Sequence, residues 1–586
     1  MTPARLRLSW ALLLSGACLL AYANGLTGGF TYDDKAIVRD NPRIRAPERI
    51  DEIFTTQYFG GPRGTGTAYR PMLLLSYAIQ WWIHGGDAFW FHAVNVLFHL
   101  TTTLLLARLL LRLAVSPPAA VGAALLFAVH PIHVEAVTSI VGRGETQAAA
   151  LVLGFLLLSL RSIDGPGRRS ISVVLALLLY LLANLTKESA AVAPALLFLC
   201  LAWRSEGGPI SRIRAALVRG LPVYAGCAVV LAGVFRIRAA VLGGAIKSAG
   251  TGIFELENSL APLPALDRAG NACAIFFRYL GRLALPLRLS SDESGWSIRP
   301  LTWHDPLTLI SILLIAALLA ASLVRLRARS PSAFGFLFLC LAALPTSNLL
   351  FPTGTIFAER LMYLPSAGFC LIAASWIAGA VPEMAALSRR RLAILAAVAL
   401  AFSARTVIRN PVWQGDEALF TNMVRVSPRS AKAHYDFAYM SAEIGNPRRA
   451  LEHYTRATEI YPGYWDAWAG RGRMERTLGD PAAAEKAYAE SVRLAPLTEN
   501  GYFGLGLTRE DRGDRKGAEE AYRDGLRHVP RSSPLAYRLA LLLSAEKRDV
   551  AVHAWRRALA IDPTSLSARR GYADWLAGSG LDSVHP

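Results

Sequence analysis

Residues 8–34 read LSWALLLSGACLLAYANGLTGGFTYDD, an apolar run followed at once by two adjacent acidic residues, Asp33 and Asp34. An apolar run of this length is enough for one helix to cross a bilayer. Arg5 and Arg7 precede the run, which would also suit a secretory signal peptide. Because more apolar runs follow, we expect a retained membrane-spanning helix with the acidic pair at its mouth.

Similar apolar segments recur through the first 410 residues. The 586-residue chain is 53% hydrophobic and only 18% charged, whereas soluble globular proteins are about a quarter charged. The segments long enough to span are 8–26, 92–113, 119–136, 145–160, 171–187, 188–204, 215–236, 306–324, 333–350, 364–382 and 391–408. The sequence therefore predicts an all-α fold in which residues 1–410 form a polytopic membrane bundle of about eleven spans. Segments 72–83 and 271–289 are too short or too charged to span, and we expect them at the membrane interface.

The basic residues indicate which side of the membrane each loop occupies. Residues 411–586 hold 25 basic and 23 acidic side chains, which leaves 37 and 20 of the chain's 62 and 43 in residues 1–410. The net charge of +19 thus lies mostly in short loops, where it fixes topology rather than binds nucleic acid. With these loops cytoplasmic, the acidic pair and the region after residue 410 face the other side. The six cysteines are scattered and indicate neither a metal site nor a disulfide framework.

The region after residue 410 contains a tandem repeat. Prolines recur at positions 428, 462, 496, 530 and 563, with spacings of 34, 34, 34 and 33 residues. A glycine, an alanine and a tyrosine recur in phase, beginning with Gly445, Ala450 and Tyr454. This period is typical of helix–turn–helix tetratricopeptide (TPR) repeats. We therefore expect a linker over 411–429 and a TPR α-solenoid of about four repeats and a capping helix over 430–586, which binds a protein or peptide or, alternatively, acts as a spacer or dimerisation module.

The acidic pair is the first candidate for chemistry. Paired carboxylates can act as a general base, whereas the alternative for Asp33 and Asp34 is a plain helix cap or turn. His130, His133 and Glu135 form a second cluster on the same side of the membrane. Their spacing lacks the i, i+4 histidine pair of a helical zinc site, so a polar lining of a substrate cavity is the better interpretation.

Two further clusters on this side carry cations. Lys187 and Glu188 interrupt an apolar stretch. They form either a salt bridge at a tight turn or a site that holds a cation where a lipid phosphate would lie. Glu359 and Arg360 are followed by Tyr363, and Arg suits phosphate because its donors form a planar fork.

In combination and in order, these motifs resemble those of the transmembrane-and-TPR (TMTC-type) O-mannosyltransferases. The matching segments are Tyr32-Asp33-Asp34, Tyr69-Arg70-Pro71, Phe91-His92-Ala93-Val94-Asn95, His130-Pro131-Ile132-His133-Val134-Glu135-Ala136, Lys187-Glu188 and Ala358-Glu359-Arg360. The resemblance implies a GT-C fold that transfers a sugar, mannose in eukaryotic members, from a polyprenyl phosphate to a Ser/Thr hydroxyl of a protein. It also implies that the reaction and the repeats lie on the non-cytoplasmic side.

The hypothesis that follows assigns roles to the clusters. Asp33 or Asp34, with Asp33 preferred, would take the proton of the acceptor hydroxyl. The leaving phosphate needs fixed cations, and the candidates are Lys187, Arg360 and Arg143. The candidate cavity side chains are His130, His133, Glu135, Glu145, Glu188, Glu359 and Tyr363. No metal ligand is assigned, a need for a divalent cation is left open, and no cofactor is expected beyond the lipid-linked sugar.

The Arg-rich, Lys-poor composition suggests a bacterial chain. We therefore expect an inner-membrane protein with its catalytic face and repeats in the periplasm. Two alternatives remain. One is a non-enzymatic membrane scaffold whose repeats recruit envelope proteins, and the other is a GT-C enzyme that glycosylates a lipid or a glycan.

Overall fold

The computed structural model describes residues 3–60, 68–164, 169–243, 252–379, 381, 383–545 and 548–578. Within these ranges the secondary structure is helical and includes no β-strand. The chain forms two compact units. The bundle unit is Met1–Glu293 with Ile298–Val426, and the repeat unit is Ser294–Ser297 with Ser427–Pro586. The prediction of an all-α fold with a helical bundle and a repeat array is thus confirmed.

In the described part of the bundle unit, eleven helices coincide with the eleven apolar segments. They are α1 (Pro3–Tyr22), α5 (Ala88–Arg112), α6 (Pro117–Val129), α8 (Arg143–Asp164), α9 (Arg169–Thr186), α10 (Ala193–Arg204), α11 (Pro209–Leu242), α14 (Pro306–Arg327), α15 (Pro331–Ala343), α16 (Ser366–Ala378) and α17 (Arg389–Arg409). Among the described residues, 6 helices are long and apolar enough to cross a membrane, or up to 7 if α6 and the segment Pro131–Thr138, bent by 48°, count as one span. Helix length therefore supports fewer spans than the predicted eleven.

The other apolar helices are short because prolines and polar turns interrupt them. α6 stops before Pro131, α15 ends where a 3-10 turn with Pro345 begins, and α16 starts after Pro365. Proline lacks the N–H that a helix interior needs, so these runs cannot continue as one helix. No proline stands at Lys187, but its extended backbone and the 3-10 turn after it separate α9 from α10. Irregular backbone at membrane depth is tolerated where it is buried in protein or lines a cavity.

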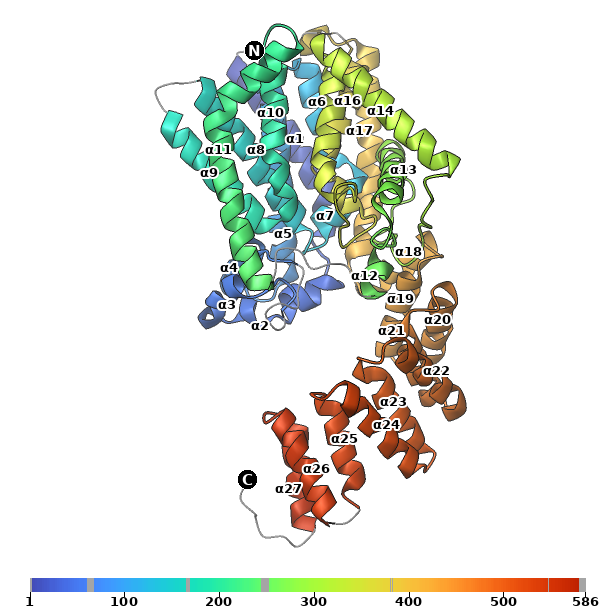
Figure 1. The fold of residues 1–586 in the computed structure, drawn as a ribbon. Helices are drawn as coiled ribbons and strands as arrows, with labels where there is room; N and C mark the ends of the chain where they lie inside the picture. The colour runs from blue at the N-terminus through green and yellow to red at the C-terminus, as the bar shows by residue number, and fades with distance from the viewer. Residues whose placement is uncertain are drawn as a thin grey trace. The chain divides into compact units, whose positions relative to one another are not determined.

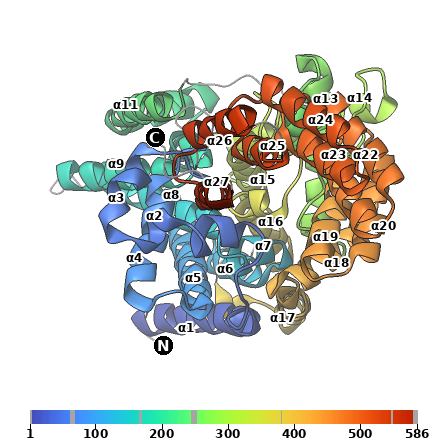
Figure 2. The same ribbon diagram turned by 90° about the horizontal axis from the view of Figure 1, so that it is seen from below.

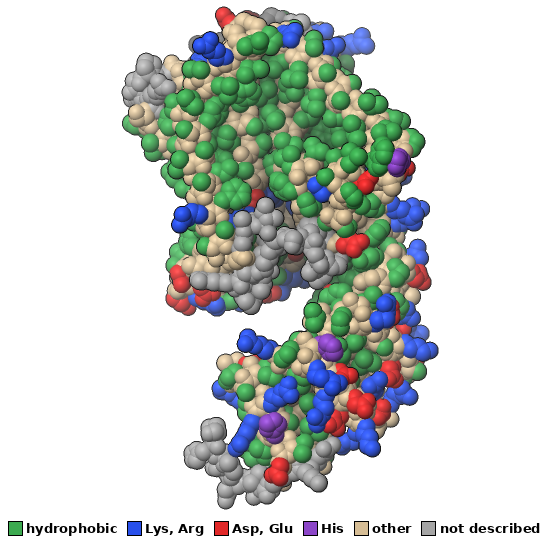
Figure 3. Space-filling model, in the orientation of Figure 1, with side chains coloured by type: hydrophobic (Ala, Val, Ile, Leu, Met, Phe, Trp, Pro, Cys, Tyr) green, Lys and Arg blue, Asp and Glu red, His purple; other side chains and the backbone are tan. Residues whose placement is uncertain are grey.

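The long helices pack side by side and leave apolar surface outside. α5 contacts α1, α6 and α8 (Figures 1 and 2). α15 and α16 approach so closely that a Cβ on Gly335 would lie 2.6 Å from the carbonyl oxygen of Gly368. Only 17% of the spanning window of α14 and 22% of that of α11 is buried, and hydrophobic side chains cover most of the visible face of the bundle unit (Figure 3). Small residues at helix contacts and an apolar exterior are typical of membrane bundles.

The remaining α-helices of the bundle unit connect the long ones. They are α2 (Pro42–Arg45), α3 (Ile50–Thr55), α4 (Pro71–His84), α7 (Val134–Thr138), α12 (Gly252–Glu257), α13 (Ala265–Ala284) and α18 (Asp416–Val426). α4 and α13 correspond to the two segments expected at the interface. α2, α3, α4 and α12 lie at one end of the bundle (Figure 1). There α4 buries Leu73, Leu74 and Tyr77 together with Phe91 and Ile140, which gives this end a core of its own.

The repeat unit consists of paired helices with the predicted period. Its helices are α19 (Ala431–Glu443), α20 (Pro447–Ile460), α21 (Trp465–Thr477), α22 (Pro481–Leu494), α23 (Glu499–Asp511), α24 (Arg515–His528), α25 (Ser533–Leu543), α26 (Arg548–Ile561) and α27 (Leu566–Gly578). Gly445, Gly479 and Gly513 join the helices of the first three pairs at φ values of +78°, +85° and +77°, which glycine adopts without strain. A Cβ on Gly470 would lie 2.5 Å from Tyr454, so a small residue is needed where successive helices meet. The described residues thus contain four such helix pairs, followed by α27.

The boundaries between the units differ from the predicted ones. Residues 411–429, predicted as a linker, contain α18, which belongs to the bundle unit. The repeat unit also includes Ser294–Ser297, from the loop before α14. In that segment the Gly295 carbonyl oxygen accepts a 2.9 Å hydrogen bond from the Ala431 N–H, and the Trp296 ring stacks on a tyrosine of the first repeat. A short piece of an inter-helix loop therefore completes the first repeat.

Candidate active site

The structure separates the two acidic residues that follow α1. Asp34 is fully buried, and its carboxylate accepts hydrogen bonds of 2.8–3.4 Å from the Thr31 N–H and from three groups of residues 139–141. Burial raises the pKa of Asp34 to about 7, against the effect of the backbone N–H donors. Asp34 thus ties its turn to the segment before α8, and its engaged oxygens argue against the role of catalytic base.

Asp33, in contrast, is exposed. Among the described residues, no hydrogen bond or ion pair engages its carboxylate. It lies close enough to Tyr58 and Arg360 to act on both. Burial raises the pKa of the Tyr58 phenol, and the charge of Asp33 raises it further against the effect of a nearby arginine. Asp33 is therefore the member of the pair that is free to take a proton.

Lys187 begins the cationic part of the site. Its ammonium forms an ion pair with Glu145 in the first turn of α8, and each side chain is 10% exposed. Burial lowers the pKa of Lys187, and the nearby charges of Arg70 and Arg360 lower it further, while Glu145 opposes them. Arg70, Lys187 and Arg360 therefore form one group of neighbouring cations, which we call the cation group.

Glu188 pairs with two arginines from other segments and not with Lys187. Arg70 Nη2 lies 3.0 Å from Glu188 Oε2, and Arg238 Nη1 of α11 lies 2.8 Å from Oε1. Burial would raise the pKa of Glu188, but the two arginines outweigh it and lower the pKa to about 2. The Arg70 guanidinium also lies 5.1 Å from the centre of the Tyr58 ring. Glu188 thus holds Arg70 in place from the edge of the site.

Arg360 has the most exposed side chain of the cation group, at 35%. Its guanidinium pairs with Glu135, and its backbone N–H donates a 2.8 Å bond to the other oxygen of that carboxylate. Burial would lower the pKa of Arg360, but Glu135 and, more weakly, Asp33 raise it. Glu135 is 1% exposed and therefore anchors Arg360 instead of lining a cavity.

A pocket in the bundle unit lies beside these charges. It is lined by Glu145, Ala148, Ala149, Val152, Ser189, Ala190, Ala342, Thr346, Leu361, Leu364 and Pro365. Most of these side chains are apolar, while Glu145 is the partner of Lys187 and Leu361 follows Arg360 in the chain. The pocket is therefore mostly apolar inside, with one carboxylate, Glu145, in its wall.

Arg143, predicted to bind phosphate, lies inside the protein instead. It is fully buried, and its guanidinium donates to Asn95 Oδ1 at 2.7 Å and to Gln80 Oε1 at 2.7 Å. It also donates to the Phe91 carbonyl oxygen at 2.9 Å and lies 4.5 Å from the centre of the Tyr77 ring. Acceptors on α4 and α5 occupy its donors in this structure, and the phosphate-binding role of Arg143 stays a prediction.

His130, His133 and Tyr363, predicted to line a cavity, are enclosed in the bundle together with His99. None of the four is exposed. Tyr363 Oη lies 2.7 Å from His99 Nδ1, and His133 Nε2 lies 2.7 Å from Ser366 Oγ. His130 bonds to a backbone carbonyl at 3.0 Å. This cluster holds α5, α6 and α16 together inside the bundle.

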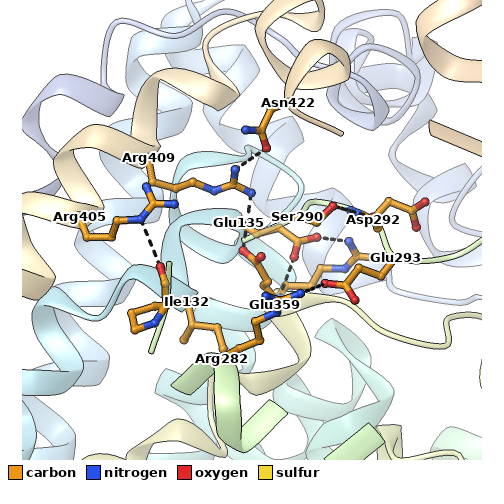
Figure 4. Close-up of polar contacts among 12 residues, drawn as sticks. Ile132, Glu135, Arg282, Ser290, Asp292, Glu293, Glu359, Arg405, Arg409 and Asn422 are labelled. Atoms are coloured by element: carbon orange, nitrogen blue, oxygen red, sulfur yellow. Dashed lines mark hydrogen bonds and ion pairs between the residues drawn. The ribbon is translucent and has the colours of Figure 1, made fainter. Parts of the chain in front are cut away.

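Glu359 was also predicted to line the cavity, but it points into the interior toward α17 (Figure 4). It is fully buried, and Arg409 Nη2 lies 3.8 Å from its Oε2. Burial raises the pKa of Glu359 to about 8, although Arg409 opposes this. Arg409 in turn donates a 2.6 Å bond to Asn422 of α18. Glu359 therefore links the segment of Arg360 to α17 and α18.

Three residues of this site were not predicted. Arg70 stands in one of the quoted motifs, which was a usable signal, whereas Tyr58 and Arg238 carried none that distinguished them from other loop or helix residues. The described residues contain no group of three or more His, Cys, Asp or Glu side chains that could hold a metal ion.

Fold and site together define a class of protein: a polytopic α-helical bundle with a group of paired charges beside a small apolar pocket, joined to a TPR array. The chain is 30% identical over 509 residues to the human protein O-mannosyl-transferase TMTC1, across 80% of this chain and 57% of that protein. It is 27% identical over 501 residues to mouse protein O-mannosyl-transferase TMTC4, across 76% of this chain and 66% of that protein. The predicted resemblance is confirmed, and the chain is a relative of the TMTC-type family that spans between half and two thirds of these proteins.

The chain was also compared with family profiles and with solved structures. No family profile matches the chain. Among solved structures, a thermophilic TPR protein of Thermus thermophilus, TTC0263, is 22% identical with a TM-score of 0.25, across 32% of this chain and 96% of that chain.

Proposed function

We propose that this protein is a membrane glycosyltransferase that moves mannose or a similar sugar from a polyprenyl-phosphate donor to Ser/Thr hydroxyls of proteins. The observation that carries the proposal is the free carboxylate of Asp33 within electrostatic reach of Arg360, whose neighbour in the chain, Leu361, lines an apolar pocket. The curated relatives, which are named protein O-mannosyl-transferases, support the same class of reaction.

The donor would bind with its phosphate at the cation group. Arg360 has a partly open guanidinium, and Arg70 and Lys187 add positive charge nearby. Each cation is already held by a carboxylate, so its position is fixed before the donor arrives. Fixed donors of this kind stabilise the charge that develops on a leaving phosphate.

In the transfer step, the acceptor hydroxyl attacks the anomeric carbon while the bond from that carbon to the phosphate oxygen breaks. Asp33 takes the hydroxyl proton, and the polyprenyl phosphate leaves with the bonding electrons toward Arg360. Such a direct displacement inverts the anomeric configuration. A general base contributes about 10²–10⁴-fold to a reaction of this type. Because Asp33 is exposed, it can then release the proton to solvent.

We place the catalytic face and the repeats on the periplasmic side of the inner membrane. The basic turns meet at one end of the bundle, where Arg112 and Arg204 both pair with Asp164 at the end of α8. Glu145, with the site, lies at the opposite end of the same helix. This arrangement supports the orientation given by the positive-inside rule. Repeats on the same side would bind the acceptor protein and raise its local concentration at the site.

The direct test compares Asp33→Asn with Asp34→Asn in membranes supplied with a radiolabelled polyprenyl-phosphate mannose. We expect Asp33→Asn to lower transfer by about 10²–10⁴-fold at an unchanged yield of folded protein. We expect Asp34→Asn to lower the yield of folded protein, because its carboxylate holds the turn. Full transfer by Asp33→Asn would remove this mechanism.

The same assay separates the alternatives. A scaffold would transfer no label from the donor, yet would lose partner capture only when the repeats are altered. An enzyme that acts on lipid or glycan would place the label in the lipid-extractable or glycan fraction and not on protein.

A further inference from the structure

Helix α18, which immediately precedes the repeats in the chain, contacts the turn that carries Asp33. Its first residue, Asp416, accepts a 2.9 Å hydrogen bond from the Tyr32 N–H through Oδ1. The other oxygen of this carboxylate forms an ion pair with Lys35. One turn later, the Phe420 ring meets the Tyr32 ring edge-on, with centroids 5.6 Å apart. α18 thus holds residues on both sides of Asp33.

The turn has a conformation that needs such support. Tyr32 has a φ of +52°, a left-handed backbone that residues with a side chain rarely adopt. The hydroxyl of Thr31 donates a 3.1 Å bond to the carbonyl oxygen of Trp413, just before α18. Asp34 fixes the other end of the turn through its bonds to residues 139–141. Since no described group binds the Asp33 carboxylate, these neighbours set the direction in which it points.

α18 has a second attachment on the side of Arg360. Asn422 accepts the 2.6 Å bond from Arg409, and Arg409 lies 3.8 Å from the carboxylate of Glu359 (Figure 4). Glu359 immediately precedes Arg360 in the chain. One helix therefore contacts the turn of the proposed base directly and, through Arg409 of α17, is linked to the segment of the proposed phosphate-binding cation.

We infer that Asp416 is a positioning residue that keeps Tyr32 in its left-handed conformation and thereby aims the Asp33 carboxylate at the acceptor hydroxyl. The inference rests on the proposed role of Asp33. Asp416 itself touches no reacting atom. Without its carboxylate, Tyr32 relaxes toward the common φ region, and Asp33 moves away from the anomeric carbon. A displacement of about 1 Å at a reacting group can lower a rate by about 10²-fold.

The test measures transfer kinetics of the full chain in nanodiscs with the radiolabelled polyprenyl-phosphate mannose. Asp416→Ala removes both contacts, whereas Asp416→Asn keeps an oxygen that accepts the Tyr32 N–H bond. Asp40→Asn is the matched control, because Asp40 is 52% exposed, lies seven residues from Asp33 and pairs with Arg39. It removes a nearby negative charge without touching the turn.

We expect Asp416→Ala to lower kcat by about 10–100-fold with the donor KM unchanged, since a misplaced base acts on the chemical step. Asp416→Asn should retain most of kcat, and Asp40→Asn should match the wild type. The inference is wrong if Asp416→Ala keeps the wild-type kcat per folded molecule, or if only its thermal stability changes. Transfer by Asp33→Asn would instead disprove the proposed function, so the two failures are distinguishable.

Discussion

Two polar regions of the bundle unit satisfy their charges in opposite ways. At the pocket, Arg70, Lys187 and Arg360 each pair with a carboxylate and keep between 10% and 35% of the side chain exposed. In the interior, Arg143 is fully buried among neutral acceptors and ring faces. An ion pair at a pocket edge can exchange its carboxylate for an anionic ligand, whereas a buried cation with neutral acceptors is fixed by them.

Arginines from similar sequence motifs therefore have different roles in this fold. Arg143 and Arg360, both predicted to bind phosphate, look equivalent in the sequence, and both stand near acidic residues. Only Arg360 has access to a ligand, because Glu135 holds one side of its guanidinium and leaves the rest open. Arg143 joins α4, α5 and α8 inside the protein.

Among variants that compare the two regions, Arg360→Gln has the largest expected effect. Removing this cation takes away fixed positive charge from the leaving phosphate, and we expect transfer to fall by about 10²–10³-fold, as for loss of one donor to a developing oxyanion. The measurement is the initial rate of label transfer per folded molecule. Because Arg360→Gln also leaves the buried Glu135 carboxylate without its partner, stability must be measured in parallel.

The double variant Glu135→Gln with Arg360→Gln serves as the control for that second effect. It removes both charges, so thermal stability should return toward the wild type while transfer stays low. Restored transfer in the double variant would show that Arg360 acts only by neutralising Glu135. Arg360 would then have a structural role, like Arg143, and no role in binding phosphate.

Arg143→Gln should have the opposite profile. The shorter amide cannot reach all of Asn95, Gln80 and the Phe91 carbonyl, and each buried acceptor left unpaired costs about 1–3 kcal/mol. We expect the free energy of unfolding to fall by about 2–3 kcal/mol, with transfer per folded molecule and the donor KM unchanged. Thermal unfolding in detergent and donor titration provide the two measurements. A rise in donor KM without loss of stability would place Arg143 at the phosphate after all.

The repeat unit could be predicted from the sequence because its contacts are local. Gly445, Ala450 and Tyr454 lie in or between helices that are consecutive in the chain. Residues that recur every 34 positions therefore make the contacts between neighbouring helices, and the period alone predicts the packing. The apolar segments of the bundle were predicted for the same reason. Their lengths were overestimated, because α6 ends before Pro131 and α15 ends before Pro345, inside runs that are apolar by composition.

The site was predicted only in part, because it joins segments that are far apart in the chain. Lys187 pairs with Glu145, 42 residues away, and Arg360 pairs with Glu135, 225 residues away. Spacing along the sequence suggested Lys187 with Glu188 instead. The hydrogen bonds that engage Asp34 likewise come from residues 139–141, which the local motif Tyr32-Asp33-Asp34 does not contain.

The smallest expected effect is that of Tyr363→Phe, and it tests the interior region most closely. The change removes the hydroxyl that lies 2.7 Å from His99 Nδ1 and keeps the ring against His133. His99 Nε2 already bonds to the Ala128 carbonyl oxygen at 2.9 Å, so in a neutral imidazole it is Nδ1 that accepts from Tyr363. Loss of this one bond should lower the free energy of unfolding by about 1 kcal/mol and leave kcat and KM unchanged. If KM for donor or acceptor instead rises several-fold at unchanged stability, Tyr363 belongs to the pocket, and the division between an open region for chemistry and an enclosed region for the fold does not hold.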